Sequence, residues 1–67
     1  MKTSTKLLHE ANNLDYLSVK LDQFMQTESF TNLREAQRLG MYSQMAAMVA
    51  YRQALRARIN DLLEHDE

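Results

Sequence analysis

The sequence contains no cysteine, and its 67 residues allow a single small domain. Without cysteine there is no disulfide, no thiolate nucleophile and no cysteine-ligated zinc site. A disulfide-stabilised secreted domain is therefore excluded, and a reducing compartment is compatible. A chain this short buries too little of its surface to be comfortably stable without such supports. Self-association is the support that remains, so we expect the single domain, residues 1–67, to form a homo-oligomer.

Proline is also absent and glycine occurs once, while the abundant residues are those of long helices. No apolar run reaches the ~20 residues of a membrane span, and no signal-peptide pattern is present. Eight lysines and arginines against nine acidic residues give a net charge of −1, so no overall field favours nucleic acid or an anionic membrane. We predict an all-α, soluble, cytoplasmic protein.

The spacing of apolar residues predicts two amphipathic helices. Over residues 5–26, Leu7, Leu14 and Leu21 recur every seven residues, with Leu17 and Phe24 at the complementary spacing, as in a coiled-coil seam. The second helix, residues 33–63, carries a stripe formed by Met41, Met48, Leu55 and Leu62, flanked by Met45 and Ile59. A glycine at position 40 lies inside this helix without a capping signal, which indicates a close helix contact or a slight bend.

Residues 27–32 are rich in side chains that favour turns and helix caps. Asn32 and Glu35 have the spacing of a capping box, and Thr31 is a competing cap. We expect Phe30 to plug the closed end of the turn. A link this short makes the two helices antiparallel neighbours, and the predicted fold is a helical hairpin.

Pairing the helices across this turn places Leu14 beside Met45 and leaves the second helix without a neighbour beyond about residue 55. Ile59, Leu62 and Leu63 would then project past the hairpin, and leaving them in water would forfeit about 1.5–3 kcal/mol each. A strip of small residues lies beside the methionine stripe and consists of Ala47, Ala50, Ala54 and Ala57. Both features predict that another copy covers the second helix, in a four-helix-bundle dimer or a larger ring.

Motifs for catalysis and metal binding are missing from the sequence. His9 and His65 are the only imidazoles, and neither belongs to an HExxH motif or to a carboxylate cluster with metal-ligand spacing. The sequence has no glycine-rich phosphate loop, nucleophile elbow or Ser-His-Asp set. We therefore predict no catalytic residues, no metal ligands and no cofactor, and a protein that is not an enzyme.

Polar residues interrupt the apolar face of the second helix at regular intervals. Gln44, Tyr51 and Arg58 recur every seven residues, and Arg52 and Arg56 form a pair on the neighbouring face. One interpretation is a buried, hydrogen-bonded layer that fixes the register of an oligomer. The other is a pocket between subunits. Because arginine binds phosphate bidentately and tyrosine offers an aromatic face and a hydroxyl, these five residues would then bind a phosphate-containing nucleotide.

A wider pattern combines a leucine-rich first helix, a turn bracketed by phenylalanines, and Gln, Met, Tyr, Leu and Arg-Ile at fixed offsets. The residues that follow it are Phe24, Phe30, Leu33, Gln37, Leu39, Gln44, Met48, Tyr51, Leu55, Arg58 and Ile59. Over residues 14–63 the chain thereby resembles a family of very short phage proteins of unassigned function, named after an open reading frame of a crAss-like phage. It departs from that pattern at Gly40, where an aliphatic residue is more usual, and in its alanine-rich centre.

This resemblance implies a phage accessory protein in the cytoplasm of an infected bacterial cell. By analogy with phage helical-hairpin oligomers that act as sponges, it implies a counter-defence protein. Such a protein would bind and sequester a nucleotide-derived immune signal, of the cyclic nucleotide or ADP-ribose type, without cleaving it. The alternative is a helical adaptor or inhibitor whose methionine and alanine faces bind a host or phage protein. A DNA-binding module is disfavoured by the charge balance and by the lack of a recognition-helix turn.

Overall fold

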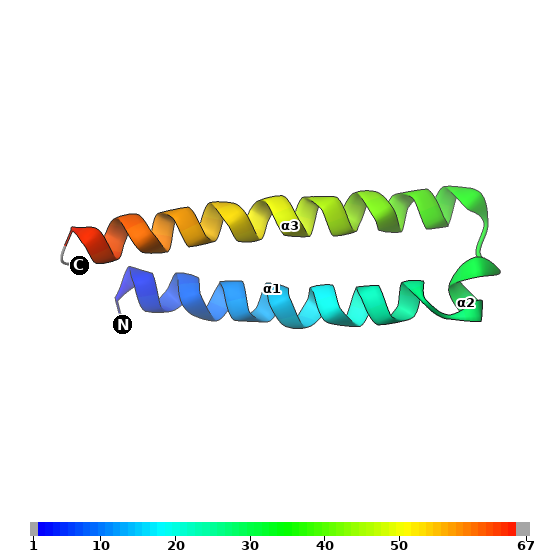
Figure 1. The fold of residues 1–67 in the computed structure, drawn as a ribbon, viewed down its shortest axis with the longest axis horizontal. Helices are drawn as coiled ribbons and strands as arrows, with labels where there is room; N and C mark the ends of the chain where they lie inside the picture. Colours follow the sequence, from blue (N-terminus) through cyan, green and yellow to red (C-terminus); the bar gives the residue numbers. More distant parts are fainter. Residues whose placement is uncertain (1, 66–67) are drawn as a thin grey trace.

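The computed structural model describes residues 2–65 and consists of two long antiparallel helices joined by a short one. The helices are α1 (Thr3–Met25), α2 (Glu28–Thr31) and α3 (Glu35–Glu64). Figure 1 shows α2 at the closed end, with the start of α1 and the end of α3 together at the open end. The predicted all-α antiparallel hairpin is confirmed. Met1, Asp66 and Glu67 of the predicted domain lie outside the described residues.

The turn between the long helices is itself partly helical. The Thr27 hydroxyl caps α2 by accepting a hydrogen bond from the backbone N–H of Phe30 at 3.3 Å. Thr31 and Asn32, the two predicted caps of the second long helix, instead end α2. α3 starts one turn later, after an extended Arg34 that provides no side-chain cap. The predicted capping box at Asn32 is therefore wrong, because this segment closes a different helix.

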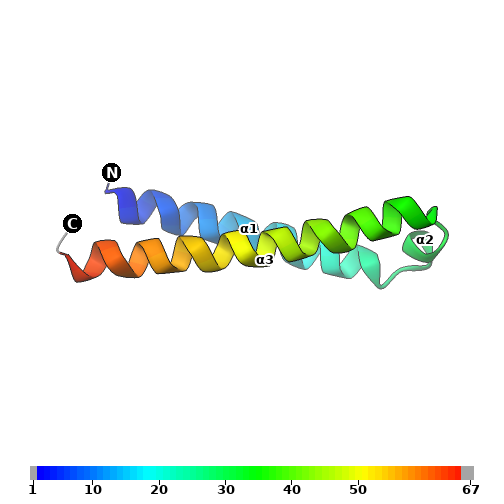
Figure 2. The ribbon, with the colours of Figure 1, turned by 90° about the horizontal axis from the view of Figure 1, so that it is seen from above.

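The core between α1 and α3 follows an alternating spacing of three and four residues. On α1 the buried and half-buried positions with this spacing are Ser4, Leu7, Ala11, Leu14, Ser18, Leu21 and Met25. On α3 they are Arg38, Met41, Met45, Met48, Arg52, Leu55, Ile59 and Leu62. Figure 2 shows the two helices crossing at a shallow angle, as expected for coiled-coil packing. The predicted stripe on the second helix is confirmed.

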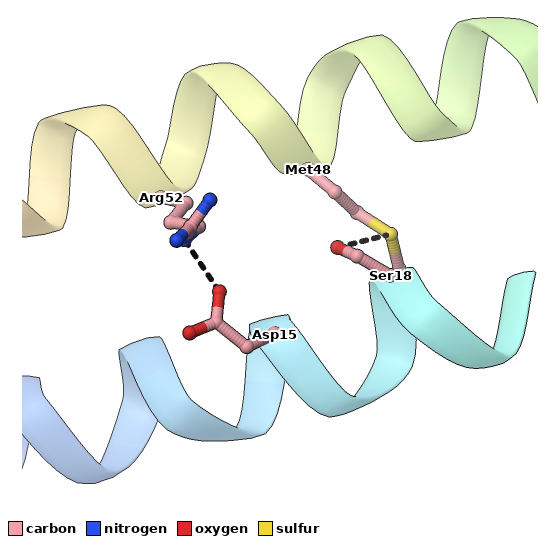
Figure 3. Close-up of polar contacts among 4 residues, drawn as sticks. All are labelled: Asp15, Ser18, Met48 and Arg52. Carbon is pink, nitrogen blue, oxygen red and sulfur yellow. Dashed lines mark hydrogen bonds and ion pairs between the residues drawn. The ribbon is translucent and has the colours of Figure 1, made fainter. Parts of the chain in front are cut away.

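Small residues occupy some positions of the seam for which large residues were predicted. Leu17 and Phe24 are 41% and 37% exposed at the edge of α1, so their assignment to the seam is wrong. Ala11 and Ser18 face α3 instead, and the Ser18 Oγ lies 3.7 Å from the Met48 Sδ (Figure 3). Small side chains on one helix make room for large ones on the other, which is how close packing without voids is reached.

The register of α3 against α1 differs from the prediction by about one heptad. Ser18 contacts Met48, whereas pairing Leu14 with Met45 would have placed Ser18 near Met41. The cause is α2, which adds a helical turn beyond the end of α1, so that α3 begins beside α2 (Figure 1). Since the shift is close to a whole heptad, the same face of α3 still packs against α1.

This register removes most of the predicted overhang at the open end. Ile59 and Leu62 pack against the buried cluster formed by Leu7, Ala11 and Leu55. The prediction that they project past the hairpin is therefore wrong, and only Leu63 of that group is exposed. The open end of the hairpin therefore gives no reason to expect self-association.

The closed end is filled by aromatic residues, as predicted for Phe30. Its ring is buried and packs edge-on against Phe24, with ring centres 6.3 Å apart, and against Tyr42 at 5.6 Å. Such pairs add about 0.5–1.5 kcal/mol to the burial of the rings. The Arg38 guanidinium donates a hydrogen bond to the carbonyl of Thr31 at 3.1 Å and ties α3 to the turn.

Gly40 makes no close contact inside the hairpin. A Cβ built at this position meets nothing within 4 Å, and α3 continues through it without interruption. The predicted close helix contact is therefore not made by α1. Glycine here costs about 1 kcal/mol relative to alanine, and no contact within the chain offsets this cost.

The hairpin is long and exposes a large surface for its mass. Its extents are 50 × 15 × 14 Å, and its radius of gyration of 15.3 Å exceeds the roughly 11 Å of a compact chain of this length. The accessible surface is 5124 Å², compared with about 4,400 Å² for a compact protein of 7.9 kDa. The single chain therefore buries a small core for the surface that it leaves in water.

Replacing Leu55 with Ala should destabilise the hairpin far more than replacing Leu17 with Ala. Leu55 is 2% exposed at the centre of the core, so its loss should cost about 2–5 kcal/mol. Leu17, at 41% exposure, should cost about 1 kcal/mol. Urea denaturation of both variants measures the difference. Equal losses would place Leu17 in the seam, against the structure.

Candidate functional site

The five residues predicted to bind a ligand lie at three positions around α3. Gln44, Tyr51 and Arg58 are exposed along one edge of the helix, and Arg52 is half-buried in the seam. Arg56 is exposed on the opposite edge, because it lies two residues before Arg58 and two residues turn an α-helix by about 200°. The polar residues Gln44, Tyr51 and Arg58 therefore do not form a buried layer within one hairpin. One chain does not bring all five side chains into a single pocket.

Tyr51 joins the polar stripe of α3 to α1. Its hydroxyl donates a hydrogen bond to the Glu10 carboxylate. That hydrogen bond raises the pKa of Tyr51, with smaller contributions in the same direction from desolvation and the Glu10 charge, while the Arg58 charge lowers it. The phenol stays protonated at neutral pH, and its exposed ring can stack on a planar group. We call Glu10, Gln44, Tyr51 and Arg58 the Tyr51 edge.

Arg52 is engaged by Asp15 across the seam (Figure 3). The two side chains are 40% and 43% exposed, so solvent screens the pair and its contribution is about 0–1 kcal/mol. The Arg52 Nε is itself buried and makes no hydrogen bond of good geometry, so the contact is an ion pair. The Arg52 guanidinium is therefore already paired within the hairpin.

A shallow groove runs along the opposite edge of the hairpin, beside Arg56. Its lining consists of Leu8, Ala11, Asn12, Asp15, Arg56, Ile59 and Asn60, which we call the Arg56 groove. Ala11 is buried and Ile59 is half-buried, whereas Leu8 and the side chains of Asn12, Arg56 and Asn60 are exposed. Neither Asn12 nor Asn60 was predicted from the sequence, because these two amides share a groove only in the register that α2 imposes. No local sequence signal marks either residue.

The arginines differ in how much hydrogen-bonding capacity they keep. Arg38 donates to the turn and Arg52 pairs with Asp15. Within residues 2–65, neither the Arg56 nor the Arg58 guanidinium has an ion pair or a hydrogen bond. Both keep the planar fork of donors that suits phosphate.

Among residues 2–65, no three His, Cys, Asp or Glu side chains lie close enough together to hold a metal ion. None of the helices in this range is long and apolar enough to cross a membrane.

Changing Glu10 to Gln should lower the pKa of Tyr51. In the wild type this pKa is raised above its unfolded value of about 10, so the hydrogen bond stabilises the fold fully below that pH. This stabilisation is lost as the pH rises through the folded pKa. NMR titration of the tyrosine ring carbons measures the shift, with Tyr16 as the internal control. An unchanged Tyr51 titration in the variant would show that the two side chains do not interact.

Comparison with known proteins bears on the whole hairpin. A family model described as Sequestin matches residues 2–61, which include α1, α2, most of α3 and all five predicted ligand-binding residues. No curated protein and no solved structure matches the chain. An origin in a crAss-like phage stays a prediction. Since the match covers most of the chain, this protein belongs to the Sequestin family.

Proposed function

We propose that this protein binds a phosphate-containing nucleotide at the Tyr51 edge and sequesters it without changing it chemically. The observation that carries the proposal is membership of the Sequestin family, whose model spans every residue of this edge. The name Sequestin favours a family whose members hold a ligand. The side chains of the edge favour the class of ligand.

The chemistry of the edge suits a ligand with a phosphate at one end and an aromatic ring at the other. The Arg58 guanidinium can bind phosphate bidentately, and the Tyr51 ring can stack on a base. The Gln44 amide both donates and accepts, so it can bind the polar edge of a base. Residues seven apart on a helix are separated by about 10.5 Å, so a ligand that contacts both Tyr51 and Arg58 must extend over about that length. A nucleotide meets these requirements.

Binding without turnover follows from the ionisable groups of the edge, which are Glu10, Tyr51 and Arg58. Hydrolysis by general acid–base catalysis needs a matched acid and base near the reacting atoms. The raised pKa of Tyr51 keeps it protonated at neutral pH, and the Glu10 carboxylate accepts its hydrogen bond. We therefore propose that the ligand stays intact and that the protein is not an enzyme.

The proposed biological role is counter-defence in the cytoplasm of an infected bacterial cell. The phage resemblance described above supports this role, and the ligand would then be an immune signal of the cyclic nucleotide or ADP-ribose type. Removing the signal from solution would be sufficient, since a receptor responds only to the free ligand.

Replacing Arg58 with Ala should abolish nucleotide binding, whereas replacing Arg56 with Ala should leave it unchanged. Arg56 is the matched control, because it has the same side chain on the same helix but lies on the opposite edge. A panel of nucleotides is tested by thermal denaturation. A ligand at about 100 times its Kd should stabilise the wild type by about 2.7 kcal/mol. Mass spectrometry of the released ligand should return the unchanged molecule.

The opposite results each have a definite meaning. Loss of binding only in the Arg56 variant would move the site to the Arg56 groove. A hydrolysed product would contradict binding without turnover. If no nucleotide stabilised the protein while a host protein co-purified with it, the adaptor alternative would replace this proposal.

A further inference from the structure

A further pocket lies at the open end of the Tyr51 edge. Its lining consists of Thr3 from α1 and Ala57, Arg58, Asp61 and Leu62 from α3, and its volume is about 320 Å³. Thr3 lies seven residues before Glu10, which places both residues on one face of α1. Arg58 belongs to the edge and to the pocket, so the pocket continues the edge beyond the residues described above. We call it the Asp61 pocket.

The Asp61 pocket contains one charged group of each sign. Arg58 and Asp61 are three residues apart on α3, and no ion pair joins them within residues 2–65. The guanidinium is a donor that suits phosphate, whereas the carboxylate only accepts hydrogen bonds. A phosphate placed beyond Arg58 in the pocket would meet the like charge of Asp61. Asp61 therefore favours a neutral group that carries hydrogen-bond donors.

The stability of α3 does not explain the carboxylate at position 61. Asp61 lies in the last turn of α3, where a negative charge interacts unfavourably with the helix dipole, and this turn has no basic residue. The His65 Nδ1 lies 3.4 Å from the Asp61 Oδ1 and 2.7 Å from the Asp61 carbonyl oxygen. This local contact leaves the Asp61 side chain 71% exposed. The carboxylate is therefore accessible to a ligand in the pocket.

The spacing of the side chains along α3 sets the order of the groups in a ligand that fills the edge and the pocket. Arg58 lies about 10.5 Å beyond Tyr51 along the helix, and Asp61 lies about 4.5 Å further. With a base on Tyr51 and phosphate at Arg58, the next group of the ligand enters the Asp61 pocket. A mononucleotide ends at its phosphate and leaves the pocket empty. A nucleoside diphosphate that carries a second sugar extends into it.

A sugar with two neighbouring free hydroxyls has the chemistry that the Asp61 pocket requires. It is neutral, and one carboxylate can accept hydrogen bonds from both hydroxyls, as acidic side chains do with ribose in dinucleotide-binding proteins. The carbon atoms of the ring can pack on Leu62 and Ala57, which also line the pocket. In a cyclic dinucleotide each ribose uses one of these hydroxyls in a phosphodiester. The terminal ribose of ADP-ribose keeps both hydroxyls free.

We infer that the Asp61 pocket is a sugar subsite and that Asp61 determines which nucleotides bind. It selects nucleotides whose diphosphate carries a second ribose with free hydroxyls, as in ADP-ribose. This inference rests on the proposed function, because Tyr51 and Arg58 place the base and the phosphate. It distinguishes the two ligand types that the proposed function includes, and it favours the ADP-ribose type.

ADP and ADP-ribose test the subsite, because they differ only in the terminal ribose. Isothermal titration calorimetry measures both dissociation constants for the wild type, Asp61→Ala and Glu64→Ala. Glu64 is the matched control, since it is an exposed carboxylate in the same turn that does not line the pocket. The wild type should bind ADP-ribose at least about 10-fold more tightly than ADP, because hydrogen bonds to a charged group are added. Asp61→Ala should reduce this ratio to about one without weakening ADP, and Glu64→Ala should keep it.

Thermal denaturation of Asp61→Ala excludes an indirect effect through the fold. Because the carboxylate opposes the helix dipole, its removal should leave the melting temperature unchanged or raise it. If Asp61→Ala weakened ADP and ADP-ribose equally, the sugar subsite would be overturned. Binding of a cyclic dinucleotide, together with equal affinities for ADP and ADP-ribose in the wild type, would also overturn it and leave the proposed function standing. If none of these nucleotides bound, the proposed function would be wrong and the subsite with it.

NMR locates the terminal ribose without a variant. The backbone amide shifts of the wild type are compared between its complexes with ADP and with ADP-ribose. The differences should be largest at Thr3, Asp61 and Leu62, which line the pocket, and small at Gln44, which lies about 25 Å from Asp61 along α3. Differences centred on Gln44 would place the second ribose at the other end of the edge and contradict the inference.

Discussion

Packing of the alternating small and large residues of α1 against the mainly large residues of α3 is the interaction on which the rest of the structure depends. The chain has no disulfide, and the described residues hold no metal cluster that could take its place. The seam centred on Leu7, Ala11 and Leu55 therefore holds the two helices together. Its register decides which polar side chains of the two helices become neighbours. Tyr51 reaches Glu10, and Arg52 reaches Asp15, because the seam places them in adjacent layers.

The single helix α3 combines three surfaces whose roles differ. With 3.6 residues per turn, neighbours in sequence point in directions about 100° apart. Arg52 therefore belongs to the core seam, while Tyr51, one residue before it, lies on the exposed polar edge. Ala50 belongs to the face turned away from α1. The fold and the proposed site are linked through this helix, since rotating α3 by one residue would exchange their surfaces.

Sequence periodicity predicted the surfaces of α3 well and those of α1 less well. On α3 the methionines, leucines and isoleucine that recur three and four residues apart form the longest apolar line, and this line was predicted, although Tyr42, Val49 and Leu63 form a second, exposed line at multiples of seven residues. On α1, the predicted line of leucines recurs every seven residues, and the second line of the seam could lie on either side of it. The larger Leu17 and Phe24 were chosen over Ala11 and Ser18, because size in a sequence does not report the size of the facing residue. The pairing register failed for another reason, since a one-turn helix in the link was not distinguishable from a loop. The same error concealed the Arg56 groove, whose two amides come from different helices.

The distribution of buried residues along the hairpin determines where it can open. Phe30 is buried at the closed end, and the cluster around Leu55 is buried near the open end. Between them the apolar core side chains of α3 are Met41, Met45 and Met48, all half-buried, and methionine adapts its shape to changing neighbours. Local unfolding requires little energy where few apolar contacts are buried. We therefore expect α1 and α3 to separate locally in the middle of the hairpin, while the buried clusters at both ends keep the helices packed together.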